Sequence, residues 1–381
     1  MRPLAVLALT AALALTACSD GAGDDPEGTG NATALGTPDP TPQPTTRTAS
    51  PATMEPDPGQ SRPRVVRTVA EGLEVPWGVA FLPDGSALVS ERDTTRILGI
   101  EDGRTREVGR IEQASPQGEA GLLGLAVSPT YDEDRLVFAY VSTAEDNRVV
   151  RMEYDGQRLG EPEPVLTGIP NGFVHDGGRL LFDDDGHLFV STGEIGEPQL
   201  AQDRGSLGGK ILRITKDGKP APGNPVKGSP VWTMGHRNVQ GLAFDDGGRL
   251  WATEFGESTW DELNLIEERR NYGWPLVEGR GDLAEYRNPF VTWRTSDASP
   301  SGLAFLDGSL WAGALRGERL WQVPVTAGGV GQPRGWFVGD YGRIRTVTAT
   351  PRGTLWVTTS NRDGRGDPAA ADDRILEVAV G

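Results

Sequence analysis

The sequence predicts an all-β protein and, within that class, a six-bladed β-propeller. Two observations carry this prediction. Gly and Pro together make up 81 of the 381 residues, or 21%, which disfavours a helix bundle because both residues destabilise helix interiors. A phrase that reads as strand, tight turn and strand then recurs six times along the chain, and recurrence at this length is typical of propeller blades.

The charge balance and the scarce residue types exclude several classes of function. With 37 Lys and Arg against 54 Asp and Glu, the net charge is −17. This charge repels phosphate backbones, so no nucleic-acid partner is expected. One Cys excludes an internal disulfide, and three His are too few for a polyhistidine metal cluster.

The N-terminus reads as an export signal. An apolar run from Leu4 to Ala17 follows Arg2 and stops at Cys18, and it is too short to span a membrane as a permanent helix. The ending LTAC resembles a bacterial lipobox, in which the Cys becomes the lipidated first residue after cleavage. We therefore expect a signal peptide over 1–17, lipidation at Cys18, and an extracytoplasmic protein held at the membrane by its lipid anchor alone. The alternative is an ordinary secretory signal with a chance Cys.

Residues 18–62 read as a disordered stalk that begins at the lipidated Cys. The segment is Gly, Thr, Pro, Asp and Ser with almost no large apolar side chain, as in 37–44 (TPDPTPQP). Such a segment cannot bury enough surface to offset the entropy lost on ordering, and proline keeps it extended. The folded catalytic domain is therefore expected over 63–381.

The repeated phrase sets the blades in order. Its first copy, 77–90 (WGVAFLPDGSALVS), has a Pro-Asp-Gly turn between two apolar runs, which is the pattern of a hairpin. The equivalent residues of the six copies are Phe81, Val127, Phe182, Phe244, Phe305 and Ala349. Their spacings are 46, 55, 62, 61 and 44 residues, close to the roughly 40 to 50 of a four-stranded blade, with the excess in loops.

The first strand of each copy is small and apolar, as in 241–244 and 302–305, which both read GLAF. This composition is typical of an innermost strand around a narrow channel. Two further apolar segments remain at the ends, 65–69 and 374–379. We expect them to complete one blade together and to close the ring, because closure removes exposed sheet edges.

Polar residues gather at two positions of the repeat. The loop leading into an innermost strand and the loop leaving the second strand open on the same mouth of the channel, because those two strands are antiparallel. Among the residues at these positions are Arg237, Arg316, Arg343 and Arg345. So much positive charge in an acidic chain indicates a polyanionic ligand held by forked hydrogen bonds. Salt bridges from these arginines to loop carboxylates are the alternative.

His175 is the candidate general base, because it leads into an innermost strand and histidine titrates near neutral pH. A buried loop histidine bonded to a carbonyl is the alternative. His187 falls in the hairpin turn at the opposite mouth and is expected to be a solvated turn residue. His236 stands at the same mouth as His175, and the sequence leaves its role open.

Five motifs in register with the blades resemble the soluble, PQQ-dependent aldose sugar dehydrogenases of the glucose/sorbosone dehydrogenase type. The motifs are 121–124 (GLLG), 175–180 (HDGGRL), 207–213 (LGGKILR), 235–244 (GHRNVQGLAF) and 261–266 (DELNLI) followed by 271–275 (NYGWP). The resemblance covers residues 64–380. Its fold is a six-bladed propeller, in agreement with the repeats.

The resemblance implies a cofactor and calcium. Pyrroloquinoline quinone (PQQ) bears three carboxylates, which accounts for the arginines. By resemblance, the residues that hold it are Arg237, Asn238, Asp261, Arg316, Arg343 and Arg345. A calcium ion at the backbone carbonyls of Gly256 and Glu257 is implied to polarise the accepting quinone carbonyl. A second, structural calcium is implied at Glu262, Tyr272 and Asp282, with solvated loop acids as the alternative.

The implied reaction is oxidation of an aldose at its anomeric carbon. His175 is implied to take the proton of the anomeric hydroxyl while hydride passes to the quinone, and the sugar leaves as a lactone. Glu119, Gln199 and Arg237 are implied to bind the sugar. The sequence does not specify the electron acceptor, for which a membrane quinone and a cytochrome are the candidates.

Four positions depart from the family pattern, and they leave other functions open. They are Glu119 where Gln is frequent, Val174 where an Asp can precede the histidine, Phe255 where a polar residue can lie over the cofactor, and Glu257 where Pro is common. One alternative is a calcium-dependent, lactonase-like hydrolase, which the arginine-rich mouth disfavours. Another is a non-catalytic propeller that binds sugar or another ligand.

Overall fold

The structure is a computed structural model that describes residues 62–381. The predicted signal peptide, the lipidation site Cys18 and the stalk up to residue 61 lie outside the described residues. In the described part, no helix is long and apolar enough to cross a membrane.

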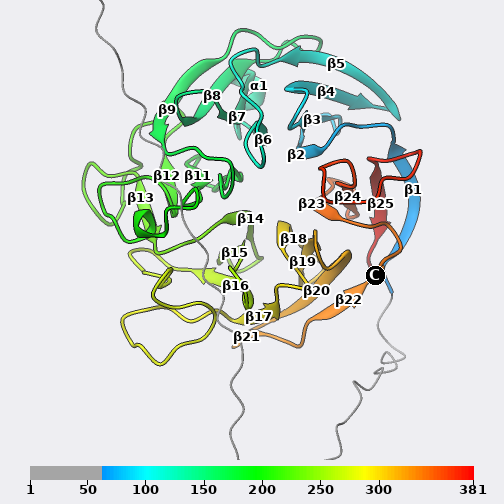
Figure 1. The fold of residues 1–381 in the computed structure, drawn as a ribbon. Coiled ribbons are helices and arrows are strands. Elements are labelled where there is room, and N and C mark those ends of the chain that lie inside the picture. The colour runs from blue at the N-terminus through cyan, green and yellow to red at the C-terminus, as the bar shows by residue number, and fades with distance from the viewer. Residues whose placement is uncertain (1–61) are drawn as a thin grey trace, which may run out of the picture. The chain divides into compact units, whose positions relative to one another are not determined.

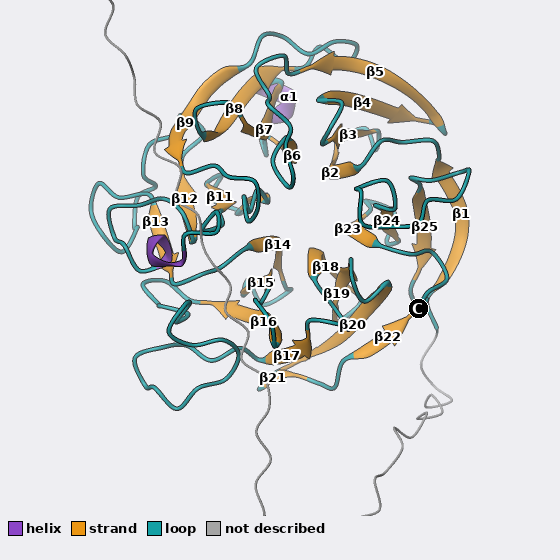
Figure 2. Ribbon diagram, viewed as in Figure 1, coloured by secondary structure: helices purple, strands orange, loops and turns teal. Residues whose placement is uncertain are grey.

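Six antiparallel sheets are arranged radially about a common axis (Figure 1). Residues 62–381 contain one short helix, α1 (Tyr131–Asp134), and one 3-10 helix, η1 (Pro198–Ala201), beside the strands that Figure 2 shows in orange. The predicted all-β, six-bladed β-propeller is therefore confirmed.

Five of the blades run outward from the axis in chain order. The first blade consists of β2 (Pro76–Phe81), β3 (Ala87–Glu91), β4 (Arg96–Glu101) and β5 (Arg104–Arg110). The second consists of β6 (Leu122–Val127), β7 (Leu136–Ser142), β8 (Asn147–Glu153) and β9 (Glu163–Ile169). The third consists of β10 (Leu180–Phe182), β11 (Leu188–Ser191), β12 (Lys210–Ile214) and β13 (Val231–Met234). The next two consist of β14 (Val239–Phe244), β15 (Leu250–Glu254), β16 (Trp260–Ile266) and β17 (Val291–Arg294); and β18 (Pro300–Leu306), β19 (Ser309–Ala314) and β20 (Arg319–Thr326), with β21 (Gly329–Val330) and β22 (Arg334–Trp336) both paired to β20.

The sixth blade joins the two ends of the described chain. Its strands β23 (Ile344–Ala349), β24 (Leu355–Thr359) and β25 (Ile375–Ala379) are completed on the outside by β1 (Arg64–Ala70). Arg64 lies opposite Ala379 in the antiparallel β1–β25 pair. The predicted closure by segments 65–69 and 374–379 is confirmed, so backbone hydrogen bonds hold the ring shut.

The repeated Gly of the innermost strands is required by close approach of neighbouring blades. A Cβ on Gly302 of β18 would lie 2.7 Å from the Cα of Thr346 on β23, which is closer than any side chain tolerates. Larger side chains fill the space between blades farther out, where Trp251 of β15 is 0% exposed. Backbone packing near the axis therefore fixes where each innermost strand starts.

The strand directions bring the candidate residues to one end of the axis. The loops leading into β10, β14 and β23 meet the loops leaving β11, β15 and β24 at that end, because paired strands are antiparallel. We call this end the proximal mouth. The end where the β10–β11 turn lies is the distal mouth.

Candidate functional site

His175 sits at the proximal mouth in the loop that leads into β10. Its Nδ1 lies 2.5 Å from Oε1 of Glu194, which follows β11. The Glu194 side chain is 1% exposed and that of His175 is 15% exposed. The pair thus presents one edge of the imidazole to the mouth, since no hydrogen bond to Nε2 occurs among residues 62–381.

The backbone around His175 is fixed by tight packing. His175 has a positive φ of 59°, and its carbonyl oxygen accepts a hydrogen bond from the N–H of Ile195 at 3.3 Å. A Cβ on Gly193 would clash with that carbonyl, so only Gly allows the loop after β11 to approach so closely. This approach is what brings Glu194 to the imidazole.

Glu119 links four parts of the mouth. Its Oε2 accepts hydrogen bonds from the His175 N–H at 3.0 Å and from Asn238 Nδ2 at 3.3 Å, and its Oε1 pairs with Arg365 at 3.1 Å. Burial raises the pKa of Glu119, but the His175 N–H and the charges of His175 and Arg365 outweigh burial and hold the pKa below its ordinary value. The carboxylate is therefore ionised and already occupied by the protein.

Asn238 is completely buried at the start of β14. Its Oδ1 accepts the N–H of Gly177 at 3.1 Å, and its Nδ2 donates to Glu119. The side chain therefore ties the loop of His175 to the loop leading into β14, and its place at the mouth agrees with the prediction.

Arg343 and Arg345 share one carboxylate, that of Asp363. Arg343 donates from Nε and one terminal nitrogen at 3.0 and 2.9 Å, and Arg345 from one terminal nitrogen at 3.3 Å. The Asp363 side chain is 2% exposed. Two guanidinium groups against one carboxylate leave a net positive charge, which fits an anionic ligand.

Arg237 has an incompletely used guanidinium. The group lies 5.4 Å over the ring of Trp274, and one terminal nitrogen reaches the carbonyl of Phe255 at a long 3.4 Å. Its Nε is buried and has no hydrogen-bond partner among the described residues. Because buried donors are normally paired, this Nε supports the presence of a ligand at the mouth.

His236 proves to be a core residue. It is completely buried, with Nδ1 2.8 Å from Glu254 and Nε2 2.9 Å from Thr233, and its ring stacks on Tyr272 at 4.6 Å. Both ring nitrogens are thus occupied, and the role that the sequence left open is a structural one.

Two predicted residues stand at the rim. Arg316, after β19, is exposed and forms no ion pair with a carboxylate of residues 62–381. Gln199 lies in η1, is exposed, and donates to Glu197 at 3.2 Å. Both side chains are accessible, but neither is held in place as Arg343 and Asn238 are.

The loop proposed for the first calcium has an ordered backbone. Glu278 Oε1 accepts the N–H groups of Glu257, Ser258, Thr259 and Trp260 at 2.8 to 3.1 Å. In a trans peptide the C=O points opposite to the N–H, so the carbonyls of Gly256 and Glu257 face away from Glu278. Neither carbonyl therefore takes part in the contact with Glu278 that orders the loop, and both remain available to coordinate a metal ion.

Asp261 supports the same loop from beneath. Its Oδ1 accepts the Gly256 N–H at 2.8 Å and its Oδ2 accepts the Ser299 N–H at 2.6 Å. Burial raises its pKa to about 6. The buried carboxylate thus binds the backbone of two loops, and its predicted role in holding the cofactor stays a prediction.

The three residues predicted for a second calcium differ in environment. Glu262 is buried, accepts hydrogen bonds from Asn264 at 2.9 Å and the Gly279 N–H at 2.7 Å, and has its pKa raised to about 8 by burial and by Glu254. The Tyr272 hydroxyl donates to the Leu265 carbonyl at 2.6 Å. Asp282 is exposed. No hydrogen bond joins these three side chains of the described residues to one another, so the second calcium stays a prediction.

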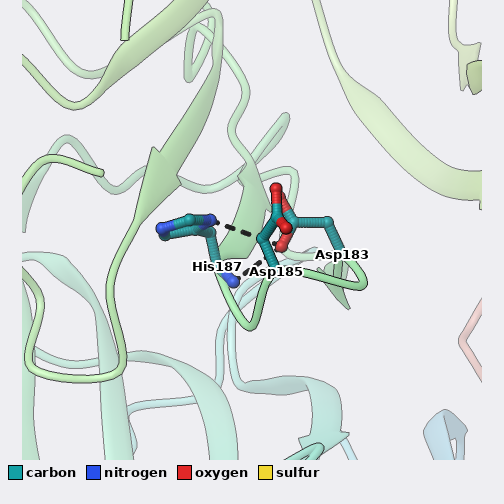
Figure 3. A group of neighbouring side chains, drawn as sticks. All are labelled: Asp183, Asp185 and His187. Carbon is teal, nitrogen blue, oxygen red and sulfur yellow. Dashed lines mark hydrogen bonds and ion pairs between the residues drawn. The ribbon is translucent and has the colours of Figure 1, made fainter. Parts of the chain in front are cut away.

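His187 lies at the distal mouth, as predicted, in a cluster with Asp183 and Asp185 (Figure 3). Its Nδ1 lies 3.4 Å from Asp183. Arg213 also reaches this nitrogen at 2.8 Å and pairs with Asp183 at 2.9 Å. A guanidinium therefore already pairs with Asp183 of the cluster, and the His187 side chain is 18% exposed and bonded to Arg213, where the sequence predicted a solvated turn residue.

Several supporting residues were not given a role from the sequence. Glu194 was visible as a polar residue after β11, but its pairing with His175 depends on two loops meeting in space. Asp363 lies in the loop leaving β24, but nothing in the sequence showed that its carboxylate would pair with two arginines. Glu278 lies in the long connection between β16 and β17, outside the two repeat positions. Asp176, which follows His175, is 1% exposed and accepts hydrogen bonds from Asn147 at 2.9 Å and the Gly172 N–H at 3.1 Å.

Comparison with known proteins gives consistent matches over the propeller. Residues 73–368 match the model of the family described as Glucose / Sorbosone dehydrogenase. The PQQ-bound form of aldose sugar dehydrogenase from Streptomyces coelicolor is 52% identical, with a TM-score of 0.82 over 84% of this chain and 98% of that chain. Aldose sugar dehydrogenase YliI of Escherichia coli (strain K12) is 29% identical over 338 residues, 78% of this chain and 91% of the relative. Quinoprotein glucose dehydrogenase B of Acinetobacter calcoaceticus is 30% identical over 258 residues, 58% of this chain and 54% of the relative.

Proposed function

Because the chain belongs to the glucose/sorbosone dehydrogenase family, we propose that it is a PQQ-dependent dehydrogenase that oxidises an aldose sugar to the lactone. The observation that carries this proposal is the proximal mouth itself. There the His175–Glu194 pair lies together with the donor set formed by Arg343 and Arg345. A base and a polyanion site in one mouth are the two parts that the reaction needs.

The donor set fits PQQ by its chemistry. Arg237, with its unpartnered buried Nε, and the net positive group of Arg343, Arg345 and Asp363 offer charged donors. Asn238 holds the loop of His175 beside them through Gly177. Forked guanidinium groups pair well with carboxylates. When bound, PQQ supplies an ortho-quinone that accepts the hydride of the substrate.

His175 is the base of the proposed reaction. Its Nε2 takes the proton of the anomeric hydroxyl while the anomeric carbon gives up hydride, so the sugar loses two electrons and two hydrogens. Glu194, on Nδ1, fixes the tautomer with the proton on Nδ1 and stabilises the imidazolium that forms. Glu194 is thus a positioning residue.

The mouth also supports calcium and sugar binding. The carbonyls of Gly256 and Glu257, turned away from Glu278, are hard oxygen ligands of the kind calcium prefers. Gln199 is exposed at the rim and is available to a sugar hydroxyl. Glu119 contributes mainly by holding His175 and Asn238, since both of its oxygens are occupied.

The cellular setting is part of the proposal. The lipobox at Cys18 supports export and anchoring through lipid alone, with a membrane quinone or a cytochrome as the electron acceptor. Cys18→Ala is expected to release the protein from the membrane fraction and to abolish labelling by a fatty-acid probe. If Cys18→Ala stays in the membrane fraction and is still labelled, a lipid anchor at Cys18 is excluded.

The reaction is tested on the purified full chain. The protein is stripped with EDTA, loaded with PQQ and calcium chloride, and assayed with a panel of aldoses and an artificial electron acceptor. We expect aldose-driven reduction that requires both additions, and loss of turnover in His175→Ala with the PQQ spectral titration preserved. His187→Ala, at the distal mouth, is the matched control and is expected to keep full activity.

Three outcomes contradict the proposal. Hydrolysis of a lactone without PQQ favours a hydrolase. The absence of any spectral change on PQQ titration favours a binding propeller. Full activity in His175→Ala excludes this residue as the base.

A further inference from the structure

A layer of side chains crosses the propeller axis beneath the proximal mouth, and Arg179 is its centre. Arg179 directly precedes β10 and is 8% exposed. Its Nε donates to the Gln240 carbonyl of β14 at 2.8 Å, and a terminal nitrogen donates to Thr346 Oγ of β23 at 3.3 Å. The guanidinium lies 4.3 Å over the ring of Trp77 of β2. Arg179, which leads into β10, therefore contacts three other innermost strands, β2, β14 and β23.

None of the groups that contact Arg179 carries a negative charge. No carboxylate of residues 62–381 forms an ion pair with Arg179. The charged side chain that acts on it is Arg345, which has the same sign and is itself paired to Asp363. Burial first, and Arg345 second, lower the pKa of Arg179 to about 9, so the group is still a cation at neutral pH.

A buried cation without a counter-charge is costly, because neither apolar walls nor neutral hydrogen-bond acceptors replace the hydration it has lost. The ring face of Trp77 offsets part of this cost through the cation–π contact. A full compensation requires an anion within reach of the guanidinium.

Arg179 also lines a cavity that opens away from the proximal mouth. This cavity, which we call the distal funnel, has a volume of about 420 Å³ and is walled by the ends of the six innermost strands. Ala80, Ala126, Ala243 and Ala304 leave room near the axis, and Thr348 supplies a hydroxyl group. The Thr346 hydroxyl donates its hydrogen to the Trp77 carbonyl. Arg179 is the one charged side chain in this wall of described residues.

We propose that the distal funnel binds a small monovalent anion, of the size of a halide, on Arg179. A single guanidinium and the Thr348 hydroxyl suit an anion with one negative charge and few acceptor sites. A divalent oxyanion would need more donors than the apolar wall provides. The site is separate from the proposed cofactor site, because the layer of Arg179, Gln240 and Thr346 lies between the funnel and the proximal mouth.

Chloride binding is tested in solution by the line width of the ³⁵Cl NMR signal, with the protein in a chloride-free buffer before titration. We expect wild-type protein to broaden the chloride signal in a saturable way that bromide competes away. Arg179→Met is expected to lose this broadening. Arg294→Met is the matched control, since Arg294 lies 4.7 Å over Trp260 at the exposed surface, and it is expected to behave as wild type.

A second variant and a second measurement distinguish loss of the anion site from misfolding of Arg179→Met. Thr348→Phe leaves Arg179 in place but fills the funnel, and it is expected to lose the broadening while the near-ultraviolet circular dichroism stays that of wild type. Crystals soaked in sodium bromide are expected to show an anomalous peak within hydrogen-bond distance of the Arg179 guanidinium.

Two results overturn the proposal. The first is unchanged saturable broadening in a folded Arg179→Met variant, or the absence of a bromide peak beside Arg179. The second is loss of the saturable chloride broadening when wild-type protein is loaded with PQQ. That result would mean that the cofactor itself is the counter-charge of Arg179. The proposed dehydrogenase function is untouched by either result, because its own test reads PQQ-dependent turnover.

Discussion

The Nδ1 atom of His175 lies 2.5 Å from the carboxylate Oε1 of Glu194. The carboxylate is 1% exposed and the imidazole 15%. A buried carboxylate held against one ring nitrogen directs the other toward the mouth. This relationship gives the first prediction.

Glu194→Gln is expected to lower kcat by about 10²-fold, because a neutral partner no longer stabilises the imidazolium that forms in the transition state. The affinity for PQQ, measured by spectral titration, is expected to stay unchanged, and Glu194→Asp is expected to recover part of kcat. Glu197→Gln, an exposed change on the same loop, serves as the control. Equal loss of kcat in the control would assign the effect to the loop instead.

Glu119→Gln is expected to tighten PQQ binding by about tenfold, since it removes a negative charge from a site for a polyanion. The amide oxygen can still accept the His175 N–H that Glu119 now accepts at 3.0 Å. Fluorescence titration with PQQ measures the change, with exposed Glu112→Gln as the control. Weaker binding in Glu119→Gln would show that the link to Arg365 matters more than the charge.

Asp363→Asn is expected to lower the free energy of unfolding of the apoprotein by about 3 kcal/mol, because it leaves buried Arg345 without its counter-charge. PQQ brings carboxylates to the same arginines, so loading is expected to raise Tm more in the variant than in wild type. Thermal melts with and without PQQ measure this difference. If the two rises are equal, Arg343 and Arg345 do not hold the cofactor. Asp367→Asn, in the same loop and exposed, is the control.

Asp176 is expected to make the protein less stable as pH rises from about 4 to about 7. Burial raises its pKa to about 7, above the value of about 3.9 in the unfolded chain. The folded state therefore binds more protons between these values, and stability falls with rising pH. The loss is on the order of 4 kcal/mol at most.

Asp176→Asn is expected to remove this part of the pH dependence. Urea unfolding at pH 4.5 and 7.5 compares the variant with wild type and with Asp132→Asn, an exposed change in α1. A variant that keeps the wild-type slope would place the titration in another group.

The fold was predictable from the sequence because its cause is local and repeated. Each copy of the phrase around Phe81, Phe244 or Phe305 encodes a hairpin through alternating apolar residues and a turn. Spacing alone then counts the blades, and β1 with β25 completes the ring as expected. The candidate residues His175, Asn238, Arg237, Arg343 and Arg345 also followed from their positions in the repeat.

The tertiary structure decided what each of those residues does. His175 and His236 both lie in loops that lead into innermost strands of neighbouring blades, yet one has an open ring edge and the other has both nitrogens occupied inside the core. The pairing of Glu194 with His175, the pairing of Asp363 with two arginines and the unpaired charge of Arg179 could not be predicted from the sequence either. Partner, burial and counter-charge depend on loops from different blades that meet only after the ring has closed, and no local pattern encodes which side chains will meet there.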